Sequence, residues 1–248
     1  MGAGSATVGG MNRDRPLILG HRGASAHAGD NTIEAFELAL AHGADGVELD
    51  VRFTADGKIV LLHDPEVGEM GPLIHHNFAT IRRAHPEVPT LDEALAVLGD
   101  LIVNVEIKNS PFELAFDPEH QMADAIARWV NRHDIHERVL VTSFNPDSVA
   151  AVRAADPLIV TGQLASPGFA RREGLPAIAE AGHAWFAPHC SDVLFDPEGA
   201  VIAAHDLDLR IATWTVDDPN DITALANAGI DAIICNDPGR AQRVLAAG

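Results

Sequence analysis

Three carboxylates in this sequence stand inside apolar runs, where an unpaired charge is costly to bury. Glu48 and Asp50 interrupt one run, and Glu106 interrupts another, two residues before Lys108. Because side chains alternate along a strand, Glu48 and Asp50 face one side, as do Glu106 and Lys108. Converging carboxylates repel one another unless a cation compensates, and an oxygen-only ligand set suits Mg²⁺ or Ca²⁺ better than zinc. We therefore predict one bound divalent cation, Mg²⁺ or Ca²⁺; the alternative is that each carboxylate is an ion-paired, solvated residue at a rim.

Two histidines stand beside other groups that could take part in chemistry. His21 follows a short apolar run and precedes Arg22, and His63 closes another run beside Asp64. Two imidazoles that titrate near neutral pH, an arginine fork and a cation can together support acid–base chemistry on a phosphodiester. Seven other histidines fall in expected loops or on polar helix faces and are interpreted as having no catalytic role: His27, His42, His75, His76, His85, His133 and His136.

These side chains need a scaffold that gathers the ends of several strands, and the spacing of short apolar runs predicts one. The strand-like runs are residues 17–19, 46–51, 102–107, 139–142, 158–161, 185–187, 210–216 and 231–235. Helical patterns separate them, so the sequence predicts an α/β protein with the TIM (β/α)8 barrel fold rather than an open sheet. Active sites of such barrels lie at the carboxyl ends of the strands, where the predicted site residues fall.

Helix starts and one interruption refine this prediction. Thr90 and Glu93 spell a capping box, and proline follows Asp117, Asn145 and Asp218 as it does at many helix starts. A single break in the alternation comes after the second run, where Asp-Gly at residues 56–57 precedes a further strand-like run at 58–63. Asp-Gly between two such runs is typical of a hairpin, so we expect a short antiparallel extension after strand two.

Composition limits the partners and the compartment. The chain has 248 residues, is 47% hydrophobic, and carries 17 Lys and Arg residues against 36 Asp and Glu residues, a formal net charge of −19. Such a negative field repels nucleic acid and anionic lipid headgroups, and no run of about 18 apolar residues occurs, so we expect neither nucleic-acid binding nor stable membrane association. Two distant cysteines favour a reducing cytoplasm. Residues 1–14 lack periodicity and are expected to form a flexible tail, with residues 15–248 as one barrel domain.

The ordered motifs resemble those of the glycerophosphodiester phosphodiesterase family. That family's pattern opens with His-Arg-Gly and continues through an Asn-Thr helix start, a Gly-Ala-Asp…Glu…Asp-Val strand, a Thr…Asp-Gly turn and a His-Asp pair. The matching segments here are residues 21–23, 30–32, 43–51, 54–57, 60–64, 104–108, 143–145 and 214–216. The resemblance extends over residues 16–248.

The resemblance implies a fold, an activity and roles for particular residues. It implies a TIM barrel that hydrolyses glycerophosphodiesters to sn-glycerol 3-phosphate and an alcohol. His21 and His63 would form the general acid–base pair, and Glu48, Asp50 and Glu106 would hold the cation. Arg22 and Lys108 would bind phosphate oxygens, and Trp214 would wall the glycerol side of the site, although an aromatic residue there could equally fill the barrel core.

Two departures from the family's pattern bear on specificity. Asp30 stands where the family usually has glutamate, and residues 65–71 lack the Arg-Thr pair usually found after the His-Asp motif. The headgroup is therefore left open, as are the division of acid and base roles and the choice of water or the glycerol 2-hydroxyl as nucleophile. The alternatives are a phospholipase-D-like enzyme acting on lysophospholipids and, in a different class, an inactive barrel that serves as a binding module.

Overall fold

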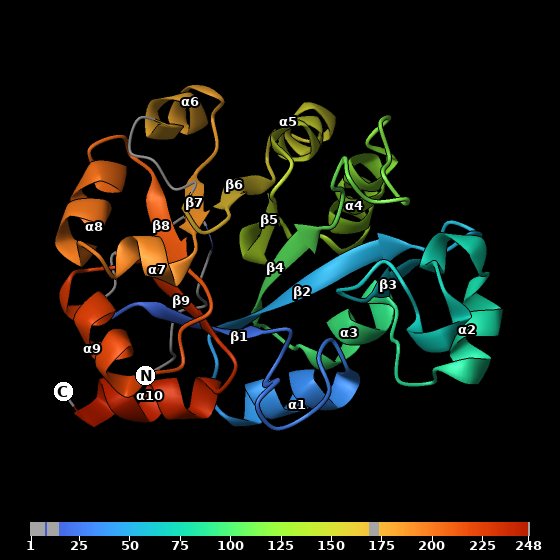
Figure 1. Cartoon of the computed structure of the whole chain (residues 1–248), viewed down its shortest axis with the longest axis horizontal. Helices are drawn as coiled ribbons and strands as arrows, with labels where there is room; N and C mark the ends of the chain where they lie inside the picture. The colour runs from blue at the N-terminus through green and yellow to red at the C-terminus, as the bar shows by residue number, and fades with distance from the viewer. Residues whose placement is uncertain (1–7, 9–14, 169–173, 248) are drawn as a thin grey trace.

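Eight parallel strands close into a barrel in the computed structural model, which describes residue 8, residues 15–168 and residues 174–247 (Figure 1). The first and last strands pair with each other, and the first also pairs with the second, which completes the ring. The barrel strands are β1 (Leu17–His21), β2 (Gly46–Phe53), β4 (Ile102–Ile107), β5 (Val139–Ser143), β6 (Val160–Ala165), β7 (Trp185–Pro188), β8 (Arg210–Thr213) and β9 (Ala232–Cys235). The predicted TIM barrel of the α/β class is confirmed.

Helices form the outer layer and connect successive strands (Figure 1). They are α1 (Ile33–Ala41), α2 (Phe78–Ala84), α3 (Leu91–Val97), α4 (Gln121–His133), α5 (Pro146–Ala155), α6 (Leu175–Glu180), α7 (Cys190–Val193), α8 (Pro197–His205), α9 (Pro219–Asn227) and α10 (Pro238–Ala247), with short 3-10 turns η1 (Gly68–Met70), η2 (Leu73–His75) and η3 (His136–Arg138). The capping box of Thr90 and Glu93 is present at the start of α3. Asn145 and Asp218 cap α5 and α9, each with proline in the first turn.

The strand expected at residues 210–216 was too long: β8 ends at Thr213, and beyond it an isolated bridge joins Trp214 to His189. Two other expected boundaries were wrong because an aspartate forms a turn. Asp117 does not begin a helix: its carboxylate accepts hydrogen bonds from the amides of Glu119 and Met122, and α4 starts only at Gln121. Likewise β6 begins at Val160 rather than two residues earlier, since the preceding turn is closed by a hydrogen bond from the Leu158 amide to the Asp156 carboxylate. Such aspartate turns compete with helix and strand starts.

The inward-facing side chains of the barrel change from apolar to polar toward the carboxyl ends of the strands. Along β1, Leu17 and Leu19 are buried in a cluster with Ile102 of β4 and Leu140 of β5, and every second residue of a strand lies on the same face. Continuing that alternation toward the carboxyl ends replaces leucine and isoleucine by polar residues, and β1 ends at His21. The inward face is therefore apolar at the amino end of the barrel and charged at the carboxyl end.

The predicted antiparallel extension is also present. Strand β3 (Ile59–Leu61) pairs with the end of β2, where Val51, Arg52 and Phe53 face Leu61, Val60 and Ile59 in register. The excursion that follows, up to residue 90, packs on a small hydrophobic cluster of its own, made of Val60, Val67, Leu73, Ile81 and Val88. In Figure 1 β3 and α2 lie beside the barrel rather than in it. The extension thus adds a small separate unit at the mouth.

The N-terminal segment expected to be a flexible tail falls largely outside the described residues, because residues 1–7 and 9–14 are not among them. Val8 is described: it is buried, its amide donates to the Glu137 carbonyl oxygen, and it packs in the cluster that contains Leu17 and Leu19. The division into tail and barrel domain stays a prediction.

Candidate active site

Three carboxylates meet where β2 and β4 end. Glu48 and Asp50 come from β2 and Glu106 from β4, where Asp50 and Glu106 are register partners. All three are buried, and each offers an oxygen that lies within 4.8 Å of the others'. The inward strand face expected from the sequence therefore brings the whole predicted cation-binding set together.

Burial and mutual repulsion make this cluster electrostatically costly. Burial raises the pKa of Glu48 well above its usual value, and the charges of Asp50 and Glu106 raise it further. Burial also raises the pKa of Glu106, to about 7, although Lys108 opposes the rise. Glu48 thus favours its protonated form, and the pKa of Glu106 lies near neutral pH even with Lys108 beside it.

Asp50 is the carboxylate that stays ionised. Burial would raise its pKa, but the nearby positive charges of Lys108 and Arg22 more than offset this and lower it. Lys108 Nζ lies 2.9 Å from Asp50 Oδ1, and Arg22 Nε lies 3.2 Å from Oδ2. The side chain of Asn31 donates to Oδ2 over 2.8 Å and accepts from the Asp50 amide over 3.1 Å. Asp50 is therefore fixed by two cations and one amide.

Lys108 and Arg22 link the carboxylates to the mouth. Lys108 Nζ also lies 2.5 Å from Glu106 Oε1, so its charge bridges β2 and β4. Arg22 has a positive φ of 55°, which turns its amide toward Glu48 Oε2 at 3.0 Å, while its guanidinium reaches Asp30 at 2.8 Å. Both cations lie close enough to the carboxylates to share an anionic ligand with a bound metal.

His21 ends β1 opposite Glu48 in the parallel register. Its Nδ1 lies 2.8 Å from Asn236 Oδ1. The Asn236 side-chain amide donates to Asp217 over 2.6 Å, so the Asn236 oxygen is the acceptor for Nδ1–H of the imidazole, and it also accepts from the Ser25 hydroxyl over 2.9 Å. Burial lowers the pKa of His21, with the hydrogen bond to Asn236 opposing this. The geometry therefore presents His21 as a neutral imidazole with Nε2 available as a proton acceptor.

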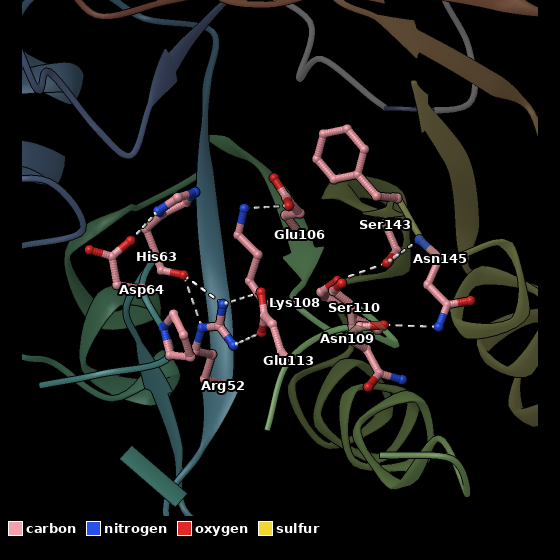
Figure 2. Close-up of a pocket in the computed structure, with 13 residues that line it drawn as sticks. Arg52, His63, Asp64, Glu106, Lys108, Asn109, Ser110, Glu113, Ser143 and Asn145 are labelled. Carbon is pink, nitrogen blue, oxygen red and sulfur yellow. Dashed lines mark hydrogen bonds and ion pairs between the residues drawn. The ribbon is translucent and has the colours of Figure 1, made fainter. Parts of the chain in front are cut away.

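His63 stands across the mouth, just past β3. Its Nδ1 lies 2.8 Å from the Asp64 carboxylate, and its side chain is about half exposed. With Glu106 and Lys108 it lines a cavity of about 360 Å³, shown in Figure 2. His21 lines a different hollow, of about 430 Å³, so the two imidazoles face different hollows.

Trp214 follows β8 and belongs to an aromatic group at the rim. Its ring lies edge-on to Phe144 and His189, at centroid distances of 5.5 and 4.9 Å, and its Nε1–H donates to the Ala187 carbonyl oxygen over 3.0 Å. Phe144 in turn lines the cavity beside His63, with Lys108 Nζ 6.0 Å from its centroid. Trp214 is partly buried and packs against the cluster that contains Leu17 and Leu19, so it stands between the barrel core and the rim.

Several residues of the site were not predicted from the sequence. Asn236 and Asp217, which hold His21, come from the segments after β9 and β8, and their position directly beyond a strand was the available signal. Arg52 continues the alternation of Glu48 and Asp50 and was missed because a lone arginine at a strand end is usually solvated. Asn31 lies within the quoted motif but was interpreted only as part of a helix start.

The donor set fits a hard divalent cation. Glu48 Oε1 is buried and has no hydrogen-bond partner among the described residues. Three carboxylates supply oxygen ligands of the kind that Mg²⁺ and Ca²⁺ prefer, and a positive ion would satisfy that orphaned oxygen and reduce the repulsion. The mouth therefore combines two imidazoles, a cation site, and two positively charged side chains, Arg22 and Lys108, that can bind phosphate oxygens. Such a centre is suited to cleaving a phosphate ester.

Comparison with known proteins agrees with this class of site. The family model for the glycerophosphoryl diester phosphodiesterase family matches residues 21–240. A glycerophosphodiester phosphodiesterase of Caldanaerobacter subterraneus subsp. tengcongensis is 30% identical over 242 residues, covering 90% of this chain and 95% of that protein.

Solved structures share the fold over nearly the whole chain. One from Silicibacter pomeroyi, named as a candidate glycerophosphoryl diester phosphodiesterase, is 28% identical with a TM-score of 0.80 and covers 94% of this chain and 93% of its own. An Oleispira antarctica phosphodiesterase in complex with the product sn-glycerol-3-phosphate has a TM-score of 0.80 at 24% identity, covering 94% of this chain and 97% of its own, and shows likeness of fold.

The fold and site thus define a barrel phosphodiesterase. The chain belongs to the glycerophosphoryl diester phosphodiesterase family. The family and the enzyme class predicted from sequence, a phosphoric diester hydrolase, are confirmed. In the part of the chain that the structure describes, none of the helices is both long and apolar enough to cross a bilayer.

Proposed function

We propose that this protein hydrolyses glycerophosphodiesters to sn-glycerol 3-phosphate and an alcohol with the help of one divalent cation, Mg²⁺ or Ca²⁺. The observation that carries the proposal is the buried cluster of Glu48, Asp50 and Glu106, in which Glu48 Oε1 has no hydrogen-bond partner among the described residues. Family membership supports the substrate class. The two free cysteines suit the reducing cytoplasm that we propose as its compartment.

In this proposal His21 and His63 move the protons. Each imidazole has its Nδ1 occupied, by Asn236 or by Asp64, so each keeps Nε2 for the substrate. One deprotonates the attacking oxygen while the other protonates the leaving alcohol, and the two roles require opposite protonation states at the start of the reaction.

The remaining residues bind and orient the phosphate. Arg22 and Lys108 contribute positive charge beside the carboxylates, where developing negative charge on the phosphate oxygens is stabilised more strongly than in water. A cation held by the three carboxylates would supply further charge neutralisation when bound. Trp214, with its aromatic neighbours, offers an apolar wall to the glycerol side.

The test is release of sn-glycerol 3-phosphate from glycerophosphodiesters with different headgroups, measured with chelator and after adding Mg²⁺ or Ca²⁺. We expect release that depends on the cation. No release from any headgroup under any condition would contradict the proposal and favour the inactive binding module.

Action on lysophospholipids is a second candidate, because two apolar side chains lie exposed on the loop between β4 and α4. Phe112 is 98% exposed and Leu114 is 72% exposed, and this loop borders the cavity beside His63. An acyl chain could cover both. The same assay run with a lysophospholipid separates the candidates: a higher kcat/KM than for the water-soluble diesters would make the lipid the preferred substrate.

A further inference from the structure

Arg52 is a buried cation that the proposed mechanism does not use. It lies on β2 two residues beyond Asp50, and its side chain is 5% exposed. A guanidinium remains charged in proteins, so its burial requires several strong hydrogen bonds. The partners that Arg52 finds show what it holds in place.

Both edges of the guanidinium are occupied, as Figure 2 shows. Nε and Nη2 donate to the His63 backbone carbonyl oxygen over 2.9 and 2.7 Å. Nη1 and Nη2 donate to the Glu113 carboxylate over 2.7 and 3.3 Å. One planar group thus joins the segment after β3 to the loop after β4, across the base of the cavity.

The other contacts around His63 are fewer: the Leu62 amide before it donates to the Asp50 carbonyl oxygen over 3.1 Å. Strand β3 has three residues and ends two residues before His63. The imidazole's hydrogen bond goes to Asp64, whose side chain is 75% exposed, and an exposed pair of this kind contributes little rigidity. The fork from Arg52 to the carbonyl is buried and charge-assisted, which makes it a much stronger anchor.

We propose that Arg52 is a positioning residue that fixes His63 relative to the cation site and couples its backbone to the loop carrying Glu113. The inference rests on the proposed function, because it needs His63 to transfer a proton. Asp50 and Arg52 lie on the same strand, β2, so the distance between them is fixed. The hydrogen bonds from Arg52 to His63 therefore hold His63 at a fixed position relative to the carboxylate cluster.

A double-mutant cycle tests this in the full-length protein loaded with Mg²⁺. Arg52→Met should lower kcat by about 10- to 100-fold with little change in KM, because misplacing a reacting group by about 1 Å is enough for such a loss. In a His63→Ala background, Arg52→Met should cost less than about twofold, since the group it positions is gone. When the leaving alcohol is replaced by a more acidic one, the loss of kcat relative to the parent should change in the same direction in Arg52→Met and His63→Ala.

Arg82→Met is the matched control. Arg82 also forks a carboxylate, that of Glu93, and donates to a backbone carbonyl, that of Val88, but lies away from the site. It should leave kcat within about twofold. If Arg52→Met does not fold, Arg52→Lys keeps the charge without the fork. It should lower kcat by less than Arg52→Met would, and again only when His63 is present.

The outcomes separate the two proposals. Equal losses from Arg52→Met with and without His63 would overturn the positioning role, as would a kcat unchanged by Arg52→Met or a loss that appears in KM alone. Full activity of His63→Ala would instead overturn the catalytic role given to His63 under the proposed function.

Discussion

The two proposed catalytic histidines are held by partners of different charge. His21 donates to the neutral side chain of Asn236, whereas His63 has the carboxylate of Asp64 as its partner. The two imidazoles are therefore oriented by groups that differ in charge, one neutral and one anionic.

We expect His21→Ala and His63→Ala each to lower kcat by roughly 10²–10⁴-fold, because each removes a proton-transfer group. The double variant should be little worse than the poorer single variant, since the two groups act as one unit. Steady-state kinetics on one diester measures this. His85→Ala, which removes a surface histidine paired with Glu87, serves as the control; a comparable loss there would contradict the assignment.

The raised pKa of Glu106 predicts how stability depends on pH when no cation is bound. Its pKa in the folded chain is about 7, against an ordinary value of 4.5, so the protonated form favours folding. That contribution is present below pH 4.5 and is lost as pH rises through about 7. The melting temperature in chelator should fall from pH 5 to pH 8 by more in the parent than in Glu106→Gln, which cannot titrate. Parallel curves for both proteins would refute this.

The residue types of the site were predictable, but the groups that hold them were not. Carboxylates inside an apolar strand are conspicuous because burying them has to be compensated, and this led to Glu48, Asp50 and Glu106. Arg52 and Asn236 act through a carbonyl and an imidazole that only the folded chain brings within reach. No sequence spacing encodes such contacts between segments distant along the chain.

Among the elements, the turn from β1 to α1 places Arg22 beside the carboxylate cluster. Arg22 and Gly23 both have positive φ, at 55° and 87°, which directs the Arg22 amide at Glu48. A Cβ added at Gly23 would lie 2.7 Å from the backbone carbon of Ala35 in α1. The helix is therefore packed directly against the turn that presents Arg22, the arginine proposed to bind phosphate.

Gly23→Ala should consequently lower the free energy of unfolding by about 2–4 kcal/mol, from backbone strain and from overpacking against α1. Activity should fall as well, because the Arg22 amide would shift away from Glu48. Thermal unfolding and kcat/KM measure the two effects. Gly43→Ala is the matched control: Gly43 also has a positive φ, 75°, but open space around its Cβ position, so only about 1 kcal/mol of strain is expected. Equal effects of both substitutions would show that the contact with Ala35 is unimportant.

At this scale the short apolar runs were enough to predict the barrel strands, because such strands are buried on both faces. The Asp-Gly pair at residues 56–57 was enough to predict the hairpin. The boundaries of α4 and β6 were missed for a local reason, namely that Asp117 and Asp156 bind nearby amides. An aspartate before a proline or an apolar run is compatible with both a cap and a turn, and packing decides between them.

For the molecule as a whole, the cation should contribute to stability as well as to chemistry. A ligand at a hundredfold excess over its Kd stabilises the folded state by about 2.7 kcal/mol. Chelation should thus abolish activity and lower the melting temperature, and Mg²⁺ or Ca²⁺ should restore both.

The Glu48→Gln variant sharpens this prediction. It should lose the metal-dependent rise in melting temperature yet melt no lower than the chelated parent, because one buried repelling charge is gone. Full activity in chelator, or an unchanged metal response in Glu48→Gln, would contradict the cation-binding role proposed for the carboxylates.

The position of β3 outside the ring has a consequence for how this enzyme loses function. His63 follows β3, in a unit with its own small cluster. This unit is joined to β2 by three paired residues, by the hydrogen bond from the Leu62 amide to the Asp50 carbonyl oxygen, and by the Arg52 fork at His63 itself. Such units open sub-globally, at a lower free energy than the whole domain. In rising urea, catalysis should therefore disappear at concentrations where the barrel's far-UV circular dichroism is still native, and amides of residues 59–61 should exchange hydrogen faster than those of β5. Coincident loss of activity and ellipticity would mean that hairpin and barrel unfold as one.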